Sequence, residues 1–256
     1  MIIKQINSRD NIKLKILAKL KQKKYRQELG LFKVENFKII LESKKLPQEI
    51  FVTQKFLEKN SKQFTTFITK SNLSEYFQID ENCLDKVTEL ENSAGIIATY
   101  KIFETSLNSK SPIIYLNAVN DPGNLGSILR NAVAFNYKNI VLDEFCADIY
   151  NTKVIQASKG AIFNLNIIND KDYKVFNQLK SKKIELLGAS LRKDAIDLKK
   201  IKIKENYCLV FGSEAHGITE MIENKISKFI KIKMSSQMES LNVASSSAII
   251  FFELNK

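Results

Sequence analysis

The sequence predicts an α/β protein of two domains, a small α/β domain followed by a larger domain with a parallel sheet. In the second half of the 256 residues, short runs of Ile, Leu and Val alternate with helical patterns. This alternation is typical of a parallel sheet whose two faces are covered by helices. The stretch 105–112 is rich in Ser and Asn and ends in Pro, which is the composition of a linker. We therefore expect domains at 1–104 and 113–256, joined by a linker at 105–112.

The first hundred residues alternate short helical patterns with short apolar strands. Apolar residues at helical spacing predict helices near 9–24, 36–45, 54–60, 71–77 and 81–90. Apolar runs bounded by polar residues predict strands at 31–34, 49–53, 64–68 and 95–100. Elements of this length indicate a compact α/β unit.

The second domain has a more regular pattern. Strands are expected at 113–119, 139–142, 163–167, 184–189, 207–211 and 229–232, and helices at 125–135, 151–158, 171–181 and 239–254. Six of the eight glycines lie in this half, and four of them close a strand or open the element after it: Gly123, Gly126, Gly188 and Gly212. Ligands of parallel sheets bind outside the carboxyl ends of the strands. We therefore expect a site built from strand-end loops.

The chain is strongly basic, with a formal net charge of +12. Residues 1–30 hold nine Lys and Arg against two acidic residues, a local charge of +7. Charge of this density attracts polyanions, so nucleic acid is the leading candidate partner. A solvated lysine-rich helix would have the same composition, and composition alone does not separate the two interpretations.

The composition argues against several other classes of protein. No apolar run is long enough to cross a bilayer and no signal peptide is recognisable, so we expect a cytoplasmic protein without a membrane partner. Three cysteines, none in a C-x-x-C pair, and a single histidine argue against a structural metal and against a disulfide framework. Each cysteine is expected to be a small buried apolar residue.

Three polar stretches lie at predicted strand ends, although the chain lacks both G-x-G-x-x-G and G-x-x-x-x-G-K-[ST]. The first is Asn-Asp-Pro-Gly-Asn-Leu-Gly-Ser-Ile-Leu-Arg-Asn-Ala at 120–132. The second, Leu-Val-Phe-Gly-Ser-Glu-Ala-His-Gly-Ile at 209–218, is a strand followed by a glycine, an acid and a second glycine. A plain strand-to-helix turn would explain these glycines but not Glu214. The third, 232–243, contains Ser-Leu-Asn at 240–242 directly before a helix of small residues.

In this order the three stretches resemble the three motifs of the SpoU/TrmH-type RNA ribose methyltransferases. The resemblance implies a SPOUT fold, in which the C-terminal segment of a parallel sheet forms a deep trefoil knot, a feature that periodicity would not indicate. It also implies S-adenosylmethionine as cofactor and a homodimer with helices 125–135 and 239–254 packed across a two-fold axis. The small residues at 244–248 permit a close helix approach, either between two chains or within one.

The resemblance assigns functional residues by position. It implies cofactor contacts from Gly212, Ile232 and Leu241, and Ala189 is expected on the same edge of the sheet. Three positions depart from the family pattern: Ala215, Lys233 and Ser236 stand where the family has glycine, proline and glycine. These changes affect the backbone freedom of the loops, so cofactor affinity is the property that they put in question. The catalytic set implied by the family is Arg130, Asn124, Glu214, Ser240 and Asn242.

Arg130 matches the catalytic arginine of the family. Because the pKa of free arginine exceeds 12, we favour Arg130 gripping a phosphate and stabilising the developing alkoxide, and a general-base role stays open. Asn124 and Asn242 can orient the nucleotide and Arg130, Ser240 can bond the phosphate or relay a proton, and Glu214 can fix the arginine or loop amides. Asn124 and Ser240 could instead simply cap helices.

The stretch Lys-Lys-Tyr-Arg-Gln-Glu-Leu-Gly-Leu-Phe-Lys-Val-Glu at 23–35 resembles the substrate-binding domain that precedes the catalytic domain in many SpoU enzymes. That domain has an α/β RNA-binding fold like a ribosomal protein. Asn36 replaces its usual glycine, and asparagine tolerates a left-handed turn. The basic residues expected to contact RNA phosphates are Lys21, Lys23, Lys24 and Arg26.

Together these features predict an S-adenosylmethionine-dependent 2′-O-ribose methyltransferase of structured RNA. A separate recognition domain favours ribosomal RNA over transfer RNA as the substrate. The alternatives are a transfer RNA 2′-O-methyltransferase and an RNA-binding assembly factor of the same fold without methylation activity.

Overall fold

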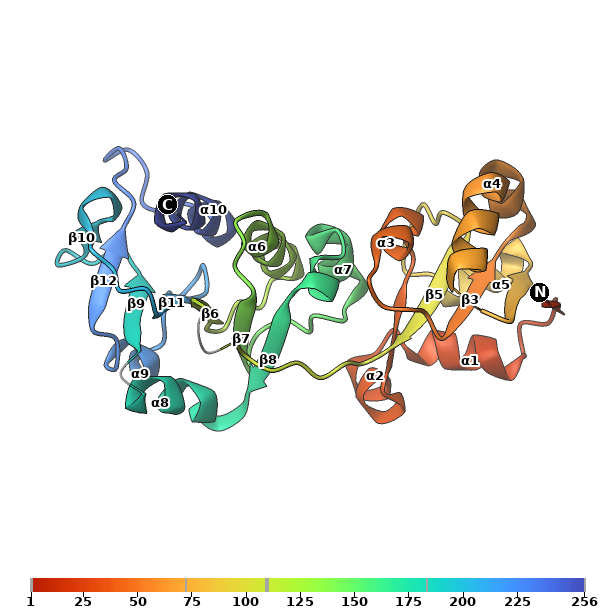
Figure 1. Cartoon of the computed structure of the whole chain (residues 1–256), viewed down its shortest axis with the longest axis horizontal. Helices are drawn as coiled ribbons and strands as arrows, with labels where there is room; N and C mark the ends of the chain where they lie inside the picture. Colours follow the sequence, from red (N-terminus) through yellow and green to blue (C-terminus); the bar gives the residue numbers. More distant parts are fainter. Residues whose placement is uncertain (1, 72, 109–110, 183, 256) are drawn as a thin grey trace. The chain divides into compact units, whose positions relative to one another are not determined.

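The computed structural model describes residues 2–71, 73–108, 111–182 and 184–255, which form two compact units (Figure 1). The first unit is Met1–Phe103 with Tyr150–Gln156, and the second is Glu104–Ile149 with Ala157–Lys256. Residues 105–108 of the expected linker belong to the second unit, where Thr105 Oγ1 both donates to the carbonyl of Ile167 and accepts from its amide at 2.8 Å. Residues 109 and 110 of that linker lie outside the described residues.

The first unit contains a mixed five-stranded sheet. Its strands are ordered β1 (Ile2–Ile6), β4 (Glu75–Ile79), β3 (Glu49–Val52), β5 (Ile96–Lys101) and β2 (Leu31–Val34). The pairs β1–β4 and β4–β3 are parallel, and the pairs β3–β5 and β5–β2 are antiparallel. The helices of this unit are α1 (Ile12–Lys19), α2 (Lys23–Leu29), α3 (Phe37–Glu42), α4 (Gln54–Ser71) and α5 (Glu81–Val87).

Several elements of the first unit differ from the prediction. The predicted strand at 64–68 is wrong, because Phe64 and Ile68 are buried on one face of α4, four residues apart. The predicted helix at 71–77 is also wrong: the chain forms β4 from Glu75, and residue 72 lies outside the described residues. Strand β1 was not predicted. The helix expected at 9–24 divides into α1 and α2. Asn36 has an extended backbone rather than a left-handed one, and its side chain caps α3.

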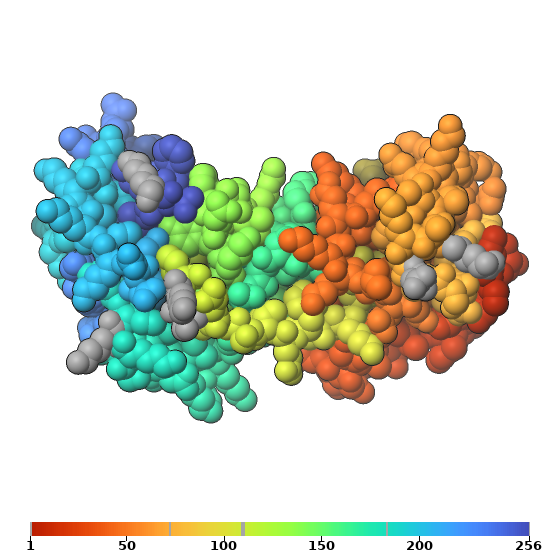
Figure 2. Space-filling model, in the orientation of Figure 1, coloured from red at the N-terminus to blue at the C-terminus, as the bar shows by residue number. Residues whose placement is uncertain are grey.

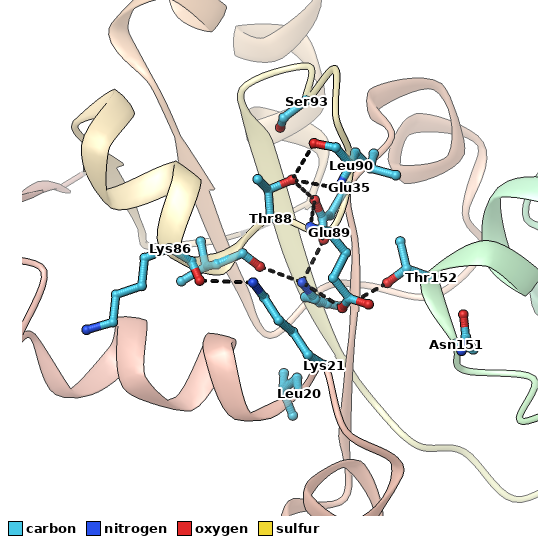
Figure 3. A network of polar contacts seen from close by, with 12 residues as sticks. Leu20, Lys21, Glu35, Lys86, Thr88, Glu89, Leu90, Ser93, Asn151 and Thr152 are labelled. Atoms are coloured by element: carbon cyan, nitrogen blue, oxygen red, sulfur yellow. Dashed lines mark hydrogen bonds and ion pairs between the residues drawn. The ribbon is translucent and has the colours of Figure 1, made fainter.

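A buried ion-pair network joins β2 to the loop after α5 (Figure 3). Lys33 is only 1% exposed, and its Nζ lies 2.7 Å from Glu35 Oε1 and 3.0 Å from Glu89 Oε1. Lys33 Nζ also donates to the carbonyl of Val87 at 2.5 Å. Glu35, itself 1% exposed, accepts from the Thr88 hydroxyl and from the Glu89 amide. Every charge of this network therefore has partners inside the first unit.

The segment Tyr150–Gln156, which includes most of α7 (Thr152–Ser158), packs within the first unit. The Tyr150 ring lies 4.5 Å from that of Phe32, centroid to centroid. Thr152 Oγ1 donates to Glu89 Oε1 at 3.3 Å, which connects α7 to the buried network in Figure 3. The predicted helix at 151–158 is confirmed, but most of its residues are grouped with the first unit.

The second unit contains the predicted parallel sheet. Its seven strands are ordered β10 (Ile196–Asp197), β12 (Lys228–Lys231), β9 (Glu185–Ala189), β11 (Tyr207–Phe211), β6 (Ile113–Leu116), β7 (Asn139–Asp143) and β8 (Asn166–Asp170), and each neighbouring pair is parallel. Helices α6 (Pro122–Ala134) and α10 (Val243–Leu254) cover one face, and α8 (Lys174–Ser181) and α9 (Glu220–Glu223) cover the other (Figure 1). Strand β8 begins three residues later than predicted, because a 3₁₀ turn occupies Ala161–Asn164.

Helices α6 and α10 pack against each other within the chain, and their surfaces adjoin in Figure 2. Asn131 Nδ2 donates to the carbonyl of Ala244 at 2.9 Å and to Ser247 Oγ at 3.0 Å. The small residues of α10 therefore serve a close contact within one chain. The predicted burial of Cys83, Cys146 and Cys208 is confirmed. Among the described helices, none is both long and apolar enough to span a membrane.

Candidate active site

A cavity of about 570 Å³ lies at the carboxyl ends of β9, β11 and β12. The four residues predicted to contact a cofactor, Ala189, Gly212, Ile232 and Leu241, all line it. Strand β9 ends at Ala189, and Gly212 and Ile232 directly follow β11 and β12. The three parallel strands therefore deliver these residues to one edge of the sheet, as the strand-end rule predicts.

The cavity wall combines apolar side chains with polar loop groups. Phe211, Ile218, Ile230 and Ile250 provide apolar surface. Residues that the sequence did not single out also line the cavity: Ser190, Leu191, Ser213, Gly217, Lys231, Met234, Val243 and Ser246. Ser190 and Leu191 directly follow a predicted strand, so the strand-end rule could have included them. A mixed wall of this kind suits a ligand that has both apolar and polar parts.

Gly212 allows the loop after β11 to fold back on itself. A Cβ atom at Gly212 would lie 2.0 Å from the carbonyl carbon of Gly217, a distance that no packed side chain tolerates. The same loop is closed by two backbone hydrogen bonds of 2.9 Å between Ser213 and Gly217, and Gly217 has a φ of 67°. Both glycines of this motif are therefore required by the backbone geometry.

The departures from the family motifs create no backbone strain. Ala215, Lys233 and Ser236 are not among the residues with positive φ. Glycine is therefore not needed at positions 215 and 236 of this chain.

Side chains from all three motifs meet beside the cavity. Asn242 Nδ2 donates to Asn124 Oδ1 at 2.8 Å and to Glu214 Oε1 at 2.5 Å. Asn242 Oδ1 accepts from the amides of Ala244 and Ser245 at 2.9 and 3.2 Å, and so caps α10. The Asn242 side chain is thus held at both ends. We call Asn124, Glu214 and Asn242 the polar cluster.

The polar cluster lies where two cavities meet. A second cavity of about 210 Å³ is lined by Asn124, Glu214 and His216, among others. Glu214 lines both cavities, whereas Asn242 lines the first and Asn124 the second. Ser240 lines the first cavity. The cluster can therefore contact a ligand in one cavity and a second reactant in the other.

Neither Asn124 nor Ser240 is a helix cap. Asp121 caps α6, and its Oδ1 accepts from the Asn124 amide at 2.7 Å. Asn242, not Ser240, caps α10. The alternative structural roles considered for these two residues are therefore wrong.

Arg130 does not line either cavity within its own chain. It is an exposed residue of α6, and its guanidinium has no hydrogen bond or ion pair in the described part of the chain. Six residues of helix separate it from Asn124, about 9 Å along the axis and roughly 120° around it. Arg130, although it matches the catalytic arginine of the family, therefore lies away from both cavities of its own chain.

The predicted RNA contacts of the first unit fall into two groups. Lys23 and Lys24 are exposed on α2. Lys21 Nζ donates to the carbonyl of Lys86 at 3.0 Å, and burial, followed by the charge of Lys33, lowers the pKa of Lys21. Lys21 is thus engaged within the protein.

Arg26 is buried, so the predicted RNA contact at this residue is wrong. It is 4% exposed, and its Nη1 donates to the carbonyls of Leu20 and Lys21 at 2.8 and 2.9 Å. The guanidinium therefore binds the backbone at the end of α1, where carbonyls lack helical partners. Arg26 has a structural position and is not available to a phosphate.

Residues 111–252 match the SpoU rRNA Methylase family, and this match covers more than half of the chain. The chain belongs to the SpoU rRNA methylase family. Residues 11–98 also match the MRM3-like substrate binding domain. The two matched regions correspond to the second and first units, and the predicted family relationship is confirmed.

Three known proteins align with nearly the whole chain. The chain is 27% identical to the 23S rRNA (guanosine(2553)-2′-O)-methyltransferase RlmP of Bacillus subtilis (strain 168), with 98% of this chain and 99% of that protein covered. An AdoMet-bound rRNA methyltransferase from Sinorhizobium meliloti superposes with a TM-score of 0.83 at 20% identity, covering 98% and 97% of the two chains. The SpoU methyltransferase AviRb from Streptomyces viridochromogenes, in complex with AdoMet, gives 0.84 at 18% identity, covering 96% and 97%. At these identities the two structures establish the shared fold.

Proposed function

We propose that the chain transfers a methyl group from S-adenosylmethionine to a ribose 2′-oxygen of ribosomal RNA. The observation that carries this proposal is the meeting of Asn124, Glu214 and Asn242 beside a cavity lined by all four predicted cofactor residues. The Bacillus subtilis relative, which aligns with nearly the whole chain and is named for 2′-O methylation of 23S rRNA, supports the ribosomal substrate. Such a substrate would place the enzyme in the cytoplasm.

The first cavity fits the cofactor in size and chemistry. Its apolar side chains suit an adenine ring, and its strand-end loops offer backbone groups to polar atoms. When bound, S-adenosylmethionine would supply a methyl group activated by a sulfonium centre. Gly212, Ile232, Leu241 and Ala189 would hold it. By analogy with the family, we infer that the C-terminal segment of this unit is threaded through a loop to form a trefoil knot.

The polar cluster would orient the ribose. Both N–H groups of Asn242 are engaged with Asn124 and Glu214, and its oxygen is engaged with α10. Glu214 Oε2 and Asn124 Nδ2 therefore remain to accept from and donate to a sugar. Ser240 would bond the adjacent phosphate. Fixing the 2′-oxygen in line with the methyl group can supply much of the required rate enhancement.

Arg130 would act from a homodimer interface. Helix α6 carries Arg130 on its exposed surface, and α10 exposes Ile249 (42%) and Phe252 (64%). A two-fold contact through α6 and α10 would cover this apolar surface and bring Arg130 toward the cavity of the second copy. There it would grip the RNA phosphate and stabilise the developing alkoxide.

The proposal is tested by calorimetry with S-adenosylmethionine and by mapping of labelled methyl groups in RNA. The wild-type protein should bind the cofactor and place label on ribose oxygens of ribosomal RNA.

Gly212→Ala should weaken cofactor binding at least about tenfold, because the new methyl group collides with Gly217. Ala215→Gly, in the same loop, should bind the cofactor like the wild type, since position 215 has no positive φ.

In the labelling experiment with wild-type protein, methyl label in the bases of RNA would refute the ribose assignment. Absence of cofactor binding would favour the inactive assembly factor, and label confined to transfer RNA would favour the transfer RNA enzyme.

The exposed lysines of α2 give a prediction for RNA binding. Replacing Lys23 and Lys24 together with alanine should reduce the slope of log affinity against log salt by about 1.4 to 1.8, because each lost phosphate contact removes roughly 0.7 to 0.9. Filter binding across a salt series measures this slope. Lys59→Ala with Lys62→Ala removes the same charge from exposed positions on α4 and should change the slope less. Equal slopes for the two pairs would contradict a phosphate contact at α2.

A further inference from the structure

The loop that leads to the active site begins with a strained residue. Ala118 lies two residues after the end of β6 and has a φ of 56°, a left-handed conformation that alanine rarely adopts. It lines the second cavity, and the following residues lead to Asn124. Strain of this kind persists only where surrounding contacts impose it.

Asp143 supplies those contacts. Both of its carboxylate oxygens lie 3.0 Å from the Ala118 amide nitrogen, which donates to them. Asp143 ends β7, is 3% exposed, and forms no ion pair in the described part of the chain. It also accepts from Asn117 Nδ2 at 2.6 Å and from the Phe145 amide at 3.1 Å. Burying a carboxylate that has only neutral hydrogen-bond donors costs free energy. The placement of Asp143 therefore indicates a functional role.

Asn117 connects Asp143 to the second active-site loop. This fully buried residue donates through its backbone amide to the carbonyl of Phe211 at 2.8 Å, next to the β6–β11 pairing. Its Oδ1 accepts from the Thr219 amide at 2.7 Å. Thr219 follows the loop that carries Glu214 and lies at the N-cap position directly before α9. Asn117, which directly follows β6, thus contacts the end of β7 through its side chain and the end of β11 through its backbone amide.

We infer that Asn117 and Asp143 are a positioning pair for methyl transfer, an inference that rests on the proposed function. The pair joins the loop of Asn124 to the loop of Glu214 and fixes the left-handed turn at Ala118. Neither residue lines either cavity, so neither touches the reactants. Their effect is exerted through the distance between Asn124 and Glu214, which Asn242 bridges.

Exchanging the two side chains, first singly and then together, tests this inference. Asp143→Asn places two amide groups face to face, and Asn117→Asp places two carboxylates face to face. Asn117→Asp removes the donor of the hydrogen bond between the two side chains. Asp143→Asn replaces one of two acceptor oxygens by an NH₂ group, so the amides of Asn117, Ala118 and Phe145 compete for the one oxygen that remains. The double swap restores the hydrogen bond between the two side chains: the new amide at 143 can donate to the new carboxylate at 117, which still accepts from Thr219. The amide oxygen at 143 can still accept from Ala118.

Single-turnover methylation at saturating cofactor and RNA is the first readout. Each single variant should be slower by about a hundredfold, the size expected for a misplacement of about 1 Å at the reacting groups. The affinity for S-adenosylmethionine should change much less, and the swap should recover most of the rate. A variant that is damaged only in stability would regain its rate at lower temperature, so rates are compared well below each thermal midpoint.

Amide hydrogen exchange of Ala118 and Thr219 is the second readout and needs no reaction. Exchange should be faster in both single variants and should return toward the wild-type rate in the swap. Folded single variants that methylate normally, or a swap no better than the singles, would overturn the inference. A wild-type protein that fails to methylate RNA would instead overturn the proposed function, and the exchange pattern would still decide whether the pair fixes the two loops.

Discussion

Arg130→Ala should lower single-turnover methylation by about a hundredfold or more, the usual loss when one preorganised charge-stabilising donor is removed. Cofactor affinity should stay near the wild-type value, because Arg130 does not line the cofactor cavity. Arg130→Lys should recover only part of the rate, since an ammonium lacks the planar fork that grips a phosphate. Lys138→Ala removes one exposed positive charge shortly after α6 and should leave the rate unchanged.

The same variant decides which copy of the chain uses Arg130. Mixed dimers of Arg130→Ala and Gly212→Ala chains contain one intact cofactor cavity, on the Arg130→Ala chain, and one arginine, on the other chain. If Arg130 acts across the interface, random mixing should restore about a quarter of the wild-type sites, because half of the dimers are mixed and each has one complete site. If Arg130 acts within its own chain, mixing should restore nothing. An Arg130→Ala protein that methylates at the normal rate when saturated with RNA would show that the catalytic assignment is wrong.

The strands of the second unit were largely predictable because buried parallel strands are almost continuous apolar runs. The cavity followed from the same pattern, because the carboxyl ends of parallel strands lie on one edge. Gly212, Ile232 and Leu241 are distant in the sequence, yet all three line one cavity. The cavity itself was thus predictable from strand ends and motif order, whereas its volume and remaining wall were not.

The first unit was harder to predict because short apolar runs fit a helix and a strand equally well. Phe64 and Ile68 were assigned to a strand, and only the packing of α4 shows their helical spacing. The exposure of the basic residues was equally hard to predict from the sequence. Arg26 lies in a dense basic segment, but its guanidinium turns inward to the carbonyls at the end of α1. Charge density identifies a basic segment without showing which of its side chains are exposed.

The contacts that join the active-site loops could not be predicted from the sequence either. Asn117 and Asp143 belong to no predicted motif, and their partners lie on other strands. Arg130 is the opposite case, a residue that matches a motif but lies away from the cavities of its own chain. The motif therefore identified Arg130 as a candidate residue. Its distance from the site depends on packing and on the expected dimer, which the motif does not show.

The largest loss of stability is expected for Lys33→Ala. This change leaves the carboxylate of Glu35 buried without its cation, since Glu35 is 1% exposed and Lys33 Nζ lies 2.7 Å from it. Removing one partner of a buried ion pair costs about 3–5 kcal/mol, a large share of the 5–15 kcal/mol that typically stabilises a domain. Hydrogen exchange should show early opening of β2 and β5, while the strands of the second unit keep their protection.

Two further variants separate the loss of the ion pair from the loss of a side chain. Lys33→Met with Glu35→Gln keeps both volumes and leaves no unpaired buried charge at these two positions, and the new amide can still accept from Thr88 and Glu89. This double variant should therefore be more stable than Lys33→Met alone, by about 2 kcal/mol or more. Lys38→Ala breaks an exposed pair with Glu42 and should have little measurable effect. If Lys33→Met alone were as stable as the double variant, the buried charge of Glu35 would not need its cation, and the network would contribute packing rather than charge compensation.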